Sequence, residues 1–235
     1  MSSLIFALSE TEIILGTDTL ATPYDGATAF FCSKAFTLPH MSMILAASGD
    51  TGFLERWWMY LNTRKVFPGI ETLAWSAQSE LQAMWREYKE EMALPAEREQ
   101  AIFHFGISEF TGEMLGFTHI SWDDFLPEEI SFRAKGHNMI FARPVCAMPE
   151  GLDDMGGFPK AFLPMMLDQR ARQAARPEGE VTIGGDIQIH HLNQAGCAVY
   201  KLARFDDYVN VEKALWGDFR GEFAARQQSQ RAAAL

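Results

Sequence analysis

The sequence predicts an α+β fold in which strands and helices occupy separate stretches of the chain. Three observations point to it. Residues 4–47 hold apolar runs of strand length, separated by short polar or proline-containing connections. Two amphipathic helical patterns then follow one another directly, and strand patterns return only after residue 100. Strands segregated from paired helices are typical of sheets covered by helices rather than of repeated βαβ units.

The first 47 residues are expected to form two hairpins. Polar residues 9–12 join the two strands of the first hairpin, and Pro39 interrupts the second, which spans 28–47. The period of apolar residues then becomes helical. Two helices are expected, from residue 51 to Pro68 and from residue 70 to Pro95.

Beyond residue 100 the pattern predicts further strands, a long loop and two more helices. The expected elements are strands at 101–110, 113–122 and 139–141, a loop at 144–159, a helix at 161–175, a final hairpin of 180–189 with 196–205, and a terminal helix from about Val211 that fades into a short disordered tail. We expect residues 1–235 to form a single domain, because a chain of this length with 48% hydrophobic residues can bury one large core.

The composition argues against several classes of function. Twenty Lys and Arg against 31 Asp and Glu give a net charge of -11, which repels phosphate backbones, so no nucleic acid is expected as a partner. No apolar run approaches the roughly 18 residues of a membrane span, so no membrane partner is expected. Neither the dinucleotide-binding GxGxxG pattern nor a P-loop is present, and no cofactor is expected.

The cysteines and histidines give no sign of a metal site. The three cysteines are odd in number and lack CxxC spacing, and the N-terminus lacks the basic segment of a signal peptide, so a reducing cytoplasm fits best. Cys32 is expected to be buried and inert. His190-His191 lacks a third ligand at suitable spacing, so solvated turn histidines are expected there and no metal.

Two further groups have surface interpretations. The acidic pairs 123–124 and 128–129 flank Pro127 and are expected to face water in a loop. Trp57 and Trp58 cannot both face one side of a helix, because neighbours differ by about 100°. One of them is either an interface anchor or a half-buried ring under a loop.

Two short motifs near the N-terminus resemble those of a known family. The stretch Asp18-Thr19-Leu20-Ala21-Thr22 and the stretch Ser33-Lys34-Ala35-Phe36 are similar to the aspartate and lysine strands of the proteasome β-subunit branch of the N-terminal nucleophile (Ntn) hydrolases. Asp18 and Lys34 have the family's spacing of sixteen residues, and counting back from Asp18 puts the family's nucleophile on Ser2. The resemblance runs from Ser2 to about Tyr208.

The resemblance implies a fold, a site and an activity. The fold is a four-layer αββα sandwich of the proteasome-like type. The activity is hydrolysis of peptide or other amide bonds without metal or cofactor, in a homo-oligomer built as a ring or stacked rings. The implied site residues are Ser2, Asp18, Lys34 and Glu180 for catalysis, and the turn Ala47, Ser48 and Gly49 for the oxyanion. Met1 precedes a small residue, so an aminopeptidase can remove it and free the Ser2 amine.

The chemistry of an N-terminal serine accounts for these residue types. The α-amine can act as the base for the neighbouring hydroxyl, and its ordinary pKa of about 8 needs only modest lowering. A charged Lys34 nearby would lower that pKa and stabilise the alkoxide, and Asp18 would hold Lys34 in place. Backbone amides of residues 47–49 could stabilise the oxyanion.

Two other interpretations stay open. The sequence departs from the family at Leu20, at Lys135, and in the late glycine motif, where Glu180 and Ile183 stand for aspartate and serine. These changes favour a subunit that kept the fold, lost its proton network and acts as a scaffold or interaction protein. The third interpretation is an unrelated sandwich that binds a small ligand.

Overall fold

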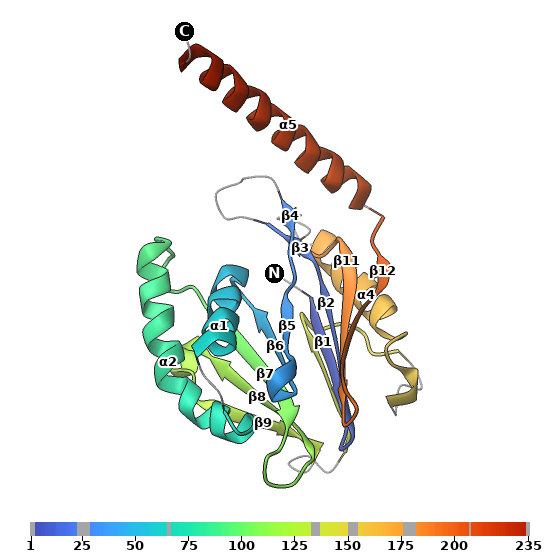
Figure 1. Cartoon of the computed structure of the whole chain (residues 1–235). Coiled ribbons are helices and arrows are strands. Elements are labelled where there is room, and N and C mark those ends of the chain that lie inside the picture. Colours follow the sequence, from blue (N-terminus) through green and yellow to red (C-terminus); the bar gives the residue numbers. More distant parts are fainter. Residues whose placement is uncertain are drawn as a thin grey trace.

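The computed structural model has the mixed α+β architecture that the sequence predicts (Figure 1). Two five-stranded antiparallel sheets face each other, and helices pack on their outer faces. The residues that the structure describes are 3–22, 29–64, 67–132, 137–149, 155–175, 182–206 and 208–233.

The first sheet carries both ends of the described body. Its strand order is β10 (Met139–Arg143), β1 (Leu4–Leu8), β2 (Glu12–Asp18), β11 (Asp186–Asn193) and β12 (Gly196–Arg204). The N-terminal hairpin β1–β2 therefore sits in the middle of the sheet, and the predicted final hairpin β11–β12 is added beside β2. Central strands with both faces covered read as near-continuous apolar runs, as β1 and β2 do.

The second sheet is built from consecutive strands. Its order is β5 (Ala35–Leu38), β6 (Met43–Ser48), β7 (Ala101–Ile107), β8 (Met114–Ile120) and β9 (Pro127–Ser131). A separate two-stranded ribbon pairs β3 (Leu20–Ala21) with β4 (Phe30–Phe31). Short 3-10 turns span Pro39–Met41, Ser121–Asp123 and Met155–Gly157.

Three apolar clusters hold these layers together. One joins the second sheet to α1 (Thr51–Arg64) and α2 (Ile70–Glu91), and one joins the first sheet to α4 (Phe162–Ala174). The third lies between the two sheets and is rich in phenylalanine, including Phe6, Phe103 and Phe105. The last helix, α5 (Tyr208–Ala233), projects away from this body (Figure 1). Within the described ranges, none of the helices is long and apolar enough to cross a bilayer.

A buried hydrogen-bonded chain ties the helices to the second sheet. Trp57 Nε1 on α1 donates to His104 Nε2 (2.8 Å), the Nδ1 atoms of His104 and His119 lie 3.3 Å apart, and His119 Nε2 lies 3.0 Å from the carbonyl oxygen of Ala74 on α2. A carbonyl only accepts, so His119 carries its proton on Nε2 and accepts at Nδ1 from His104. Both rings are uncharged in this arrangement. Burial, and for His104 also the neighbouring ring, lowers the pKa of both histidines.

The two adjacent tryptophans separate as the helical period requires. Trp57 is fully buried, whereas Trp58 is half-buried, stacks on Phe36 and donates Nε1 to the Thr37 carbonyl (3.2 Å). Trp58 therefore packs on the chain's own strand β5.

Two predicted segments differ from the structure. Residues 128–129, expected in an acidic loop, lie on strand β9, where both glutamates are exposed. Pro127 opens this strand, and an edge strand tolerates proline because its missing N–H need not be paired. The final hairpin also begins later than predicted, at Asp186, and turns only after Asn193, so the expected turn histidines His190 and His191 lie inside β11.

Candidate functional site

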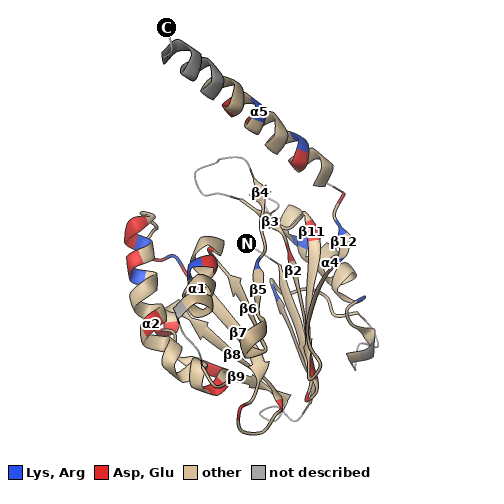
Figure 2. Ribbon diagram, in the orientation of Figure 1, with Lys and Arg blue, Asp and Glu red and all other residues tan. Residues whose placement is uncertain are grey.

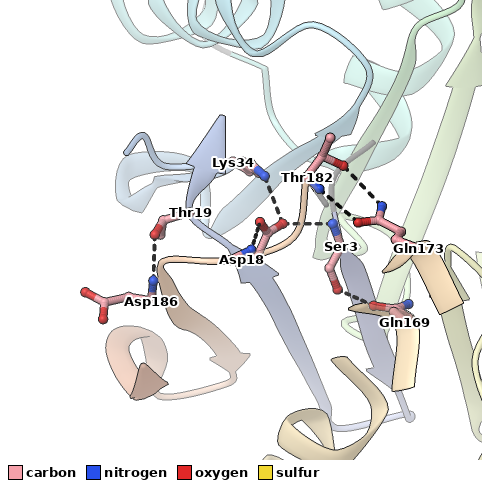
Figure 3. A network of polar contacts seen from close by, with 9 residues as sticks. Ser3, Asp18, Thr19, Lys34, Gln169, Gln173, Thr182 and Asp186 are labelled. Carbon is pink, nitrogen blue, oxygen red and sulfur yellow. Dashed lines mark hydrogen bonds and ion pairs between the residues drawn. The ribbon is translucent and has the colours of Figure 1, made fainter. Parts of the chain in front are cut away.

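The candidate site is centred on the carboxylate of Asp18, the last residue of β2 (Figure 3). Its Oδ1 accepts from Lys34 Nζ and from the backbone N–H of Ser3, each at 2.8 Å, and its Oδ2 accepts from the N–H of Gly184 at 3.1 Å. Asp18 is fully buried and Lys34 nearly so. A buried carboxylate needs such donors, because an unpaired charge away from water is costly.

Lys34 lies just before β5 and connects the carboxylate to the second sheet. Its carbonyl oxygen accepts from the N–H of Ala47 at 3.4 Å, so the predicted oxyanion turn begins beside it. Ala47 and Ser48 end strand β6 and are both buried. The structure therefore brings Asp18, Lys34 and the start of the 47–49 turn together from two sheets.

The turn at residues 47–49 is held by side chains outside the predicted site, among them Asp50, which caps the start of α1. Gly49 has φ 138°, and a Cβ there would overlap Gln100 Oε1. That oxygen accepts from the N–H of Asp50 (2.6 Å). Asp50 Oδ1 in turn accepts from Gly52 N at the start of α1 (2.9 Å) and from the Tyr88 hydroxyl (2.6 Å). Burial and the Asp50 carboxylate raise the pKa of Tyr88, so its hydroxyl keeps the proton it donates.

Helix α4 supplies a second support that sequence reasoning missed. Ser3 Oγ donates to Gln169 Oε1, and Gln169 Nε2 donates to the Pro144 carbonyl at 2.5 Å. One turn further, Gln173 exchanges two hydrogen bonds with Thr182, at 3.0 and 3.1 Å. Two glutamines four residues apart on the face that also carries Met165 and Met166 are the one sequence signal for this role.

Gly184 and Gly185, in the late glycine motif, pack against Asp18 and the residues that follow it. The Gly184 carbonyl accepts from the N–H groups of Thr19 (3.2 Å) and Leu20 (3.1 Å). Gly185 has φ 78°, and a Cβ there would overlap Thr19 Oγ1, which accepts from the N–H of Asp186 at 2.8 Å. Glycine is required at this position by both conformation and space.

Several predicted residues lie outside the described residues: Ser2, Glu180 and Lys135. Of the departures from the family pattern, Leu20 and Ile183 are described and both are buried. Ile183 packs in the apolar cluster under α4.

The structure also shows the surroundings of three other candidate side chains, Cys32, His190 and His191. Cys32, expected to be buried, is half-buried, and this partial burial raises the pKa of its thiol even though the Lys34 charge opposes it. His190 is buried, neither of its ring nitrogens has a hydrogen-bond partner among the described residues, and burial lowers its pKa to about 4. His191 Nε2 lies 2.7 Å from Glu12 Oε2. Among the described residues no group of three His, Cys, Asp or Glu side chains is arranged to hold a metal ion.

Comparison with known proteins found similarity in structure but not in sequence. No protein-family model matches the sequence, and no curated protein matches it. Among solved structures, Anbu (ancestral beta-subunit) from Yersinia bercovieri matches with a TM-score of 0.58 at 9% identity, over 96% of this chain and 97% of that one. The chain shares its fold with Anbu.

Two Anbu structures from Hyphomicrobium sp. strain MC1 agree. One, of a mutant, matches with a TM-score of 0.57 at 12% identity over 95% of this chain and 97% of that one. The other matches with a TM-score of 0.57 at 13% identity over 94% and 97%.

These matches correct the assignment made from the N-terminal motifs. The sequence resemblance pointed to the proteasome β-subunit branch, whereas the matching structures are Anbu proteins, whose fold is related to the proteasome-like fold but distinct. The physical reason is that the short motifs around Asp18 and Lys34 show only that the end of β2 in one sheet and the start of β5 in the other reach the same carboxylate. An arrangement that related folds share cannot separate their branches. What the matches show is the fold that this chain shares with Anbu.

Proposed function

We propose that this chain hydrolyses peptide or other amide bonds, with the hydroxyl of Ser2 as nucleophile after removal of Met1. The observation that carries the proposal is the double hydrogen bond to Asp18 Oδ1 from Lys34 Nζ and the Ser3 N–H. Lys34 Nζ and the Ser3 nitrogen each lie 2.8 Å from the same oxygen atom, so the two nitrogens are close to each other. The Ser3 nitrogen belongs to the peptide bond with Ser2, so the Lys34 ammonium shares a carboxylate oxygen with the residue that follows the proposed nucleophile.

The proposed reaction uses groups of the chain and one water. The Ser2 α-amine takes the hydroxyl proton as Oγ attacks the carbonyl carbon, and the Lys34 charge favours the uncharged amine and stabilises the developing alkoxide. The C–N bond then breaks, and the leaving amine receives the proton. Water next hydrolyses the Ser2 ester and restores the hydroxyl. The step needs neither a metal nor an organic cofactor.

The other predicted residues have supporting roles in this proposal. The N–H groups of Ser48 and Gly49 would donate to the oxyanion, while the Ala47 N–H already donates weakly to Lys34. Glu180 lies four residues before Gly184, whose N–H donates to Asp18. We therefore propose that Glu180 is a second carboxylate of the site, beside Asp18.

The architecture of the working protein is part of the same proposal. The three apolar clusters support a four-layer αββα sandwich, formed as a single domain over residues 1–235. We propose a cytoplasmic homo-oligomer, a ring or stacked rings, because the matching Yersinia protein is described as an ancestral beta-subunit.

The proposal is tested by intact mass and acyl trapping. Protein from the native host is weighed for loss of Met1, then treated with an activated ester, and the N-terminal peptide is examined for an acyl group on Ser2. We expect Met1 to be absent and Ser2→Thr to retain acylation. Ser2→Ala should lose both acylation and turnover. Quantitative retention of Met1, or unchanged turnover in Ser2→Ala, contradicts the nucleophile assignment.

A second candidate function is a scaffold that kept the fold without catalysis. The observation that favours it is the fully buried Ile183, which stands where the resembled family has a serine and offers no hydroxyl for proton transfer. This candidate predicts that Ser2 is not acylated even when Met1 is absent, which separates it from incomplete processing.

A further inference from the structure

The segment that carries Lys34 lies outside both sheets. Residues 32–34 follow β4 and precede β5, and they belong to neither strand. Backbone hydrogen bonds hold the two ends of this segment. The Cys32 N–H donates to the Thr19 carbonyl at 2.9 Å, and the Lys34 carbonyl accepts from the Ala47 N–H at 3.4 Å, which is long for such a bond. The place of the Lys34 side chain therefore depends on what holds the residue between these ends.

Ser33 is that residue, and its hydroxyl connects the two sheets. Ser33 Oγ lies 2.7 Å from the Ala35 carbonyl oxygen and 2.7 Å from Gln188 Oε1. Ala35 opens β5 in the second sheet, whereas Gln188 lies on β11 in the first sheet. A hydroxyl donates one proton and accepts others, and a side-chain amide both donates and accepts, so Ser33 can contact both partners at once.

Gln188 lies one step from Asp18 in the pairing of β2 with β11. Asp18 is opposite Ile187, the residue before Gln188. Two consecutive residues before β5 are thus bonded to two neighbouring places in the first sheet, Ser33 to Gln188 at 2.7 Å and Lys34 Nζ to Asp18 at 2.8 Å. A lysine has a long, flexible stem. Fixing the residue before Lys34 therefore limits where its ammonium can lie.

The charge of this ammonium is weakly screened. Lys34 is 1% exposed. Strands β1, β5, β6, β7 and β8 contain no Lys, Arg, Asp or Glu, and charged residues are correspondingly few on the strands in Figure 2. At an effective dielectric constant of about 20, moving an ammonium from about 4 to about 5 Å from an amine changes the pKa of that amine by about 0.6.

We propose that Gln188 is a positioning residue of the site, which holds Lys34 in place through the hydroxyl of Ser33. The inference rests on the proposed function, because it gives Gln188 a part in setting how readily the Ser2 amine takes up a proton. Gln188 acts through Ser33 and Lys34 and not on the substrate. Without Gln188 the ammonium is free to move away from the amine, whose pKa then rises toward its ordinary value of about 8.

The hold on Lys34 is measured without any reaction. A buried ammonium held in an ion pair exchanges its protons slowly and is visible by nitrogen NMR, and the Nζ signal of Lys34 is assigned by its loss in Lys34→Met. We expect the parent to show this signal, and Gln188→Met and Ser33→Ala to lose or broaden it. Ser33→Thr keeps the hydroxyl and should retain the signal.

The matched control is Gln194→Met. Gln194 also joins the two sheets through its side-chain amide, because its Nε2 donates to the Gly112 carbonyl at 2.6 Å. It lies in the turn between β11 and β12, at the end of the sheets away from Lys34 (Figure 1). Gln194→Met should leave the Lys34 signal unchanged. Loss of the signal in both glutamine variants would mean that Gln188 only holds the sheets together, which overturns the proposal.

The pH profile of Ser2 acylation measures the effect on the site. In Gln188→Met the acid limb of this profile should move up by about 0.6 pH unit, because the amine must be uncharged to act as base. Below that limb, acylation should slow by about fourfold in kcat, with KM unchanged. Gln194→Met should keep the limb of the parent.

Two failures are distinguishable. If Gln188→Met has the Lys34 signal and the acid limb of the parent, positioning by Gln188 is wrong while hydrolysis by Ser2 stands. If the parent is not acylated but Gln188→Met alone loses the Lys34 signal, the proposed function is wrong and the hold of Gln188 on Lys34 stands. If Gln188→Met does not fold, Ser33→Ala decides the same question, because it removes the same contact from the other side.

Discussion

Lys34 Nζ and Asp18 Oδ1 form an ion pair of 2.8 Å in which both side chains are buried. The pair joins the last residue of a central strand in one sheet to the segment that opens the other. Its stabilising effect depends on both partners being present, because either charge alone would be left in a site without water.

Asp18→Asn should therefore destabilise the protein by about 3 to 5 kcal/mol, the usual cost of breaking a buried pair. Urea unfolding followed by circular dichroism measures the change. The control is Asp206→Asn, which removes an exposed partner of Arg170 and should cost less than about 1 kcal/mol. A cost below 1 kcal/mol for Asp18→Asn would show that the pair is dispensable.

Stability should fall as the pH is lowered from about 7 toward 4. His104, His119 and His190 are buried with lowered pKa values, to about 4 for His190, whereas unfolded histidines titrate near 6.5. Below about 6.5 the unfolded chain binds protons that the folded chain does not, so the free energy of unfolding falls, by about 1.4 kcal/mol per pH unit for His190 between pH 6.5 and 4. His104 and His119 act in the same direction. Urea midpoints from pH 8 to pH 4 measure the slope.

The matched variants for this slope are His190→Leu and His40→Gln. The first removes one of the three buried groups and should make the slope shallower. The second changes an exposed histidine and should leave the slope unaltered. A protein that becomes more stable on acidification over this range would refute the assignment of neutral buried rings.

Glu109→Ala should cost about 1 kcal/mol because Glu109 caps helix α2. Its carboxylate accepts from the N–H groups of Glu71 (3.0 Å) and Thr72 (2.8 Å). Burial raises the pKa of Glu109, but hydrogen bonds from Glu71 and Thr72 outweigh it and lower the pKa to about 2. The cap is thus present above the unfolded value of about 4.3 and is lost as the pH falls toward 2.

Thermal unfolding at pH 7 and pH 2.5 checks the cap. The difference between parent and Glu109→Ala should shrink at the lower pH. Glu87→Ala, at an exposed position near the C-terminal end of the same helix, serves as control and should change stability by less than about 0.5 kcal/mol, the usual limit for surface substitutions. An equal effect of both substitutions would argue against capping.

Gln169→Leu should loosen the N-terminal strand. The substitution leaves the Ser3 hydroxyl and the Pro144 carbonyl without their partner, at a cost of about 1 to 3 kcal/mol. Hydrogen exchange of the β1 amides should become faster, and acylation of Ser2 should slow in kcat more than in KM. Gln82→Leu, on the exposed side of α2, should change neither. Unchanged exchange in β1 would mean that Gln169 does not hold this strand.

The mixed α+β class could be predicted from the sequence for a physical reason, because near-continuous apolar runs identify buried strands. Asp18 and Lys34 were selected through the resemblance of their two motifs to a known family, and the structure brings the two side chains together. Strand β9 was missed because Pro127 and its two glutamates look like a loop when the paired edge of β8 is unknown. The role of Gln169 was missed because the spacing of Gln169 and Gln173 on one helix face does not reveal their partners, which are distant in sequence.

The first turn of α5 is connected to the candidate site by a series of contacts. Tyr208 lies against the Arg204 guanidinium, Arg204 Nε donates to Asp186 Oδ1 at 2.7 Å, and the Asp186 N–H donates to Thr19 Oγ1, beside Asp18. A helix of 26 residues is about 39 Å long. The contacts that anchor the base of this long helix therefore end at the residue next to the Asp18 carboxylate.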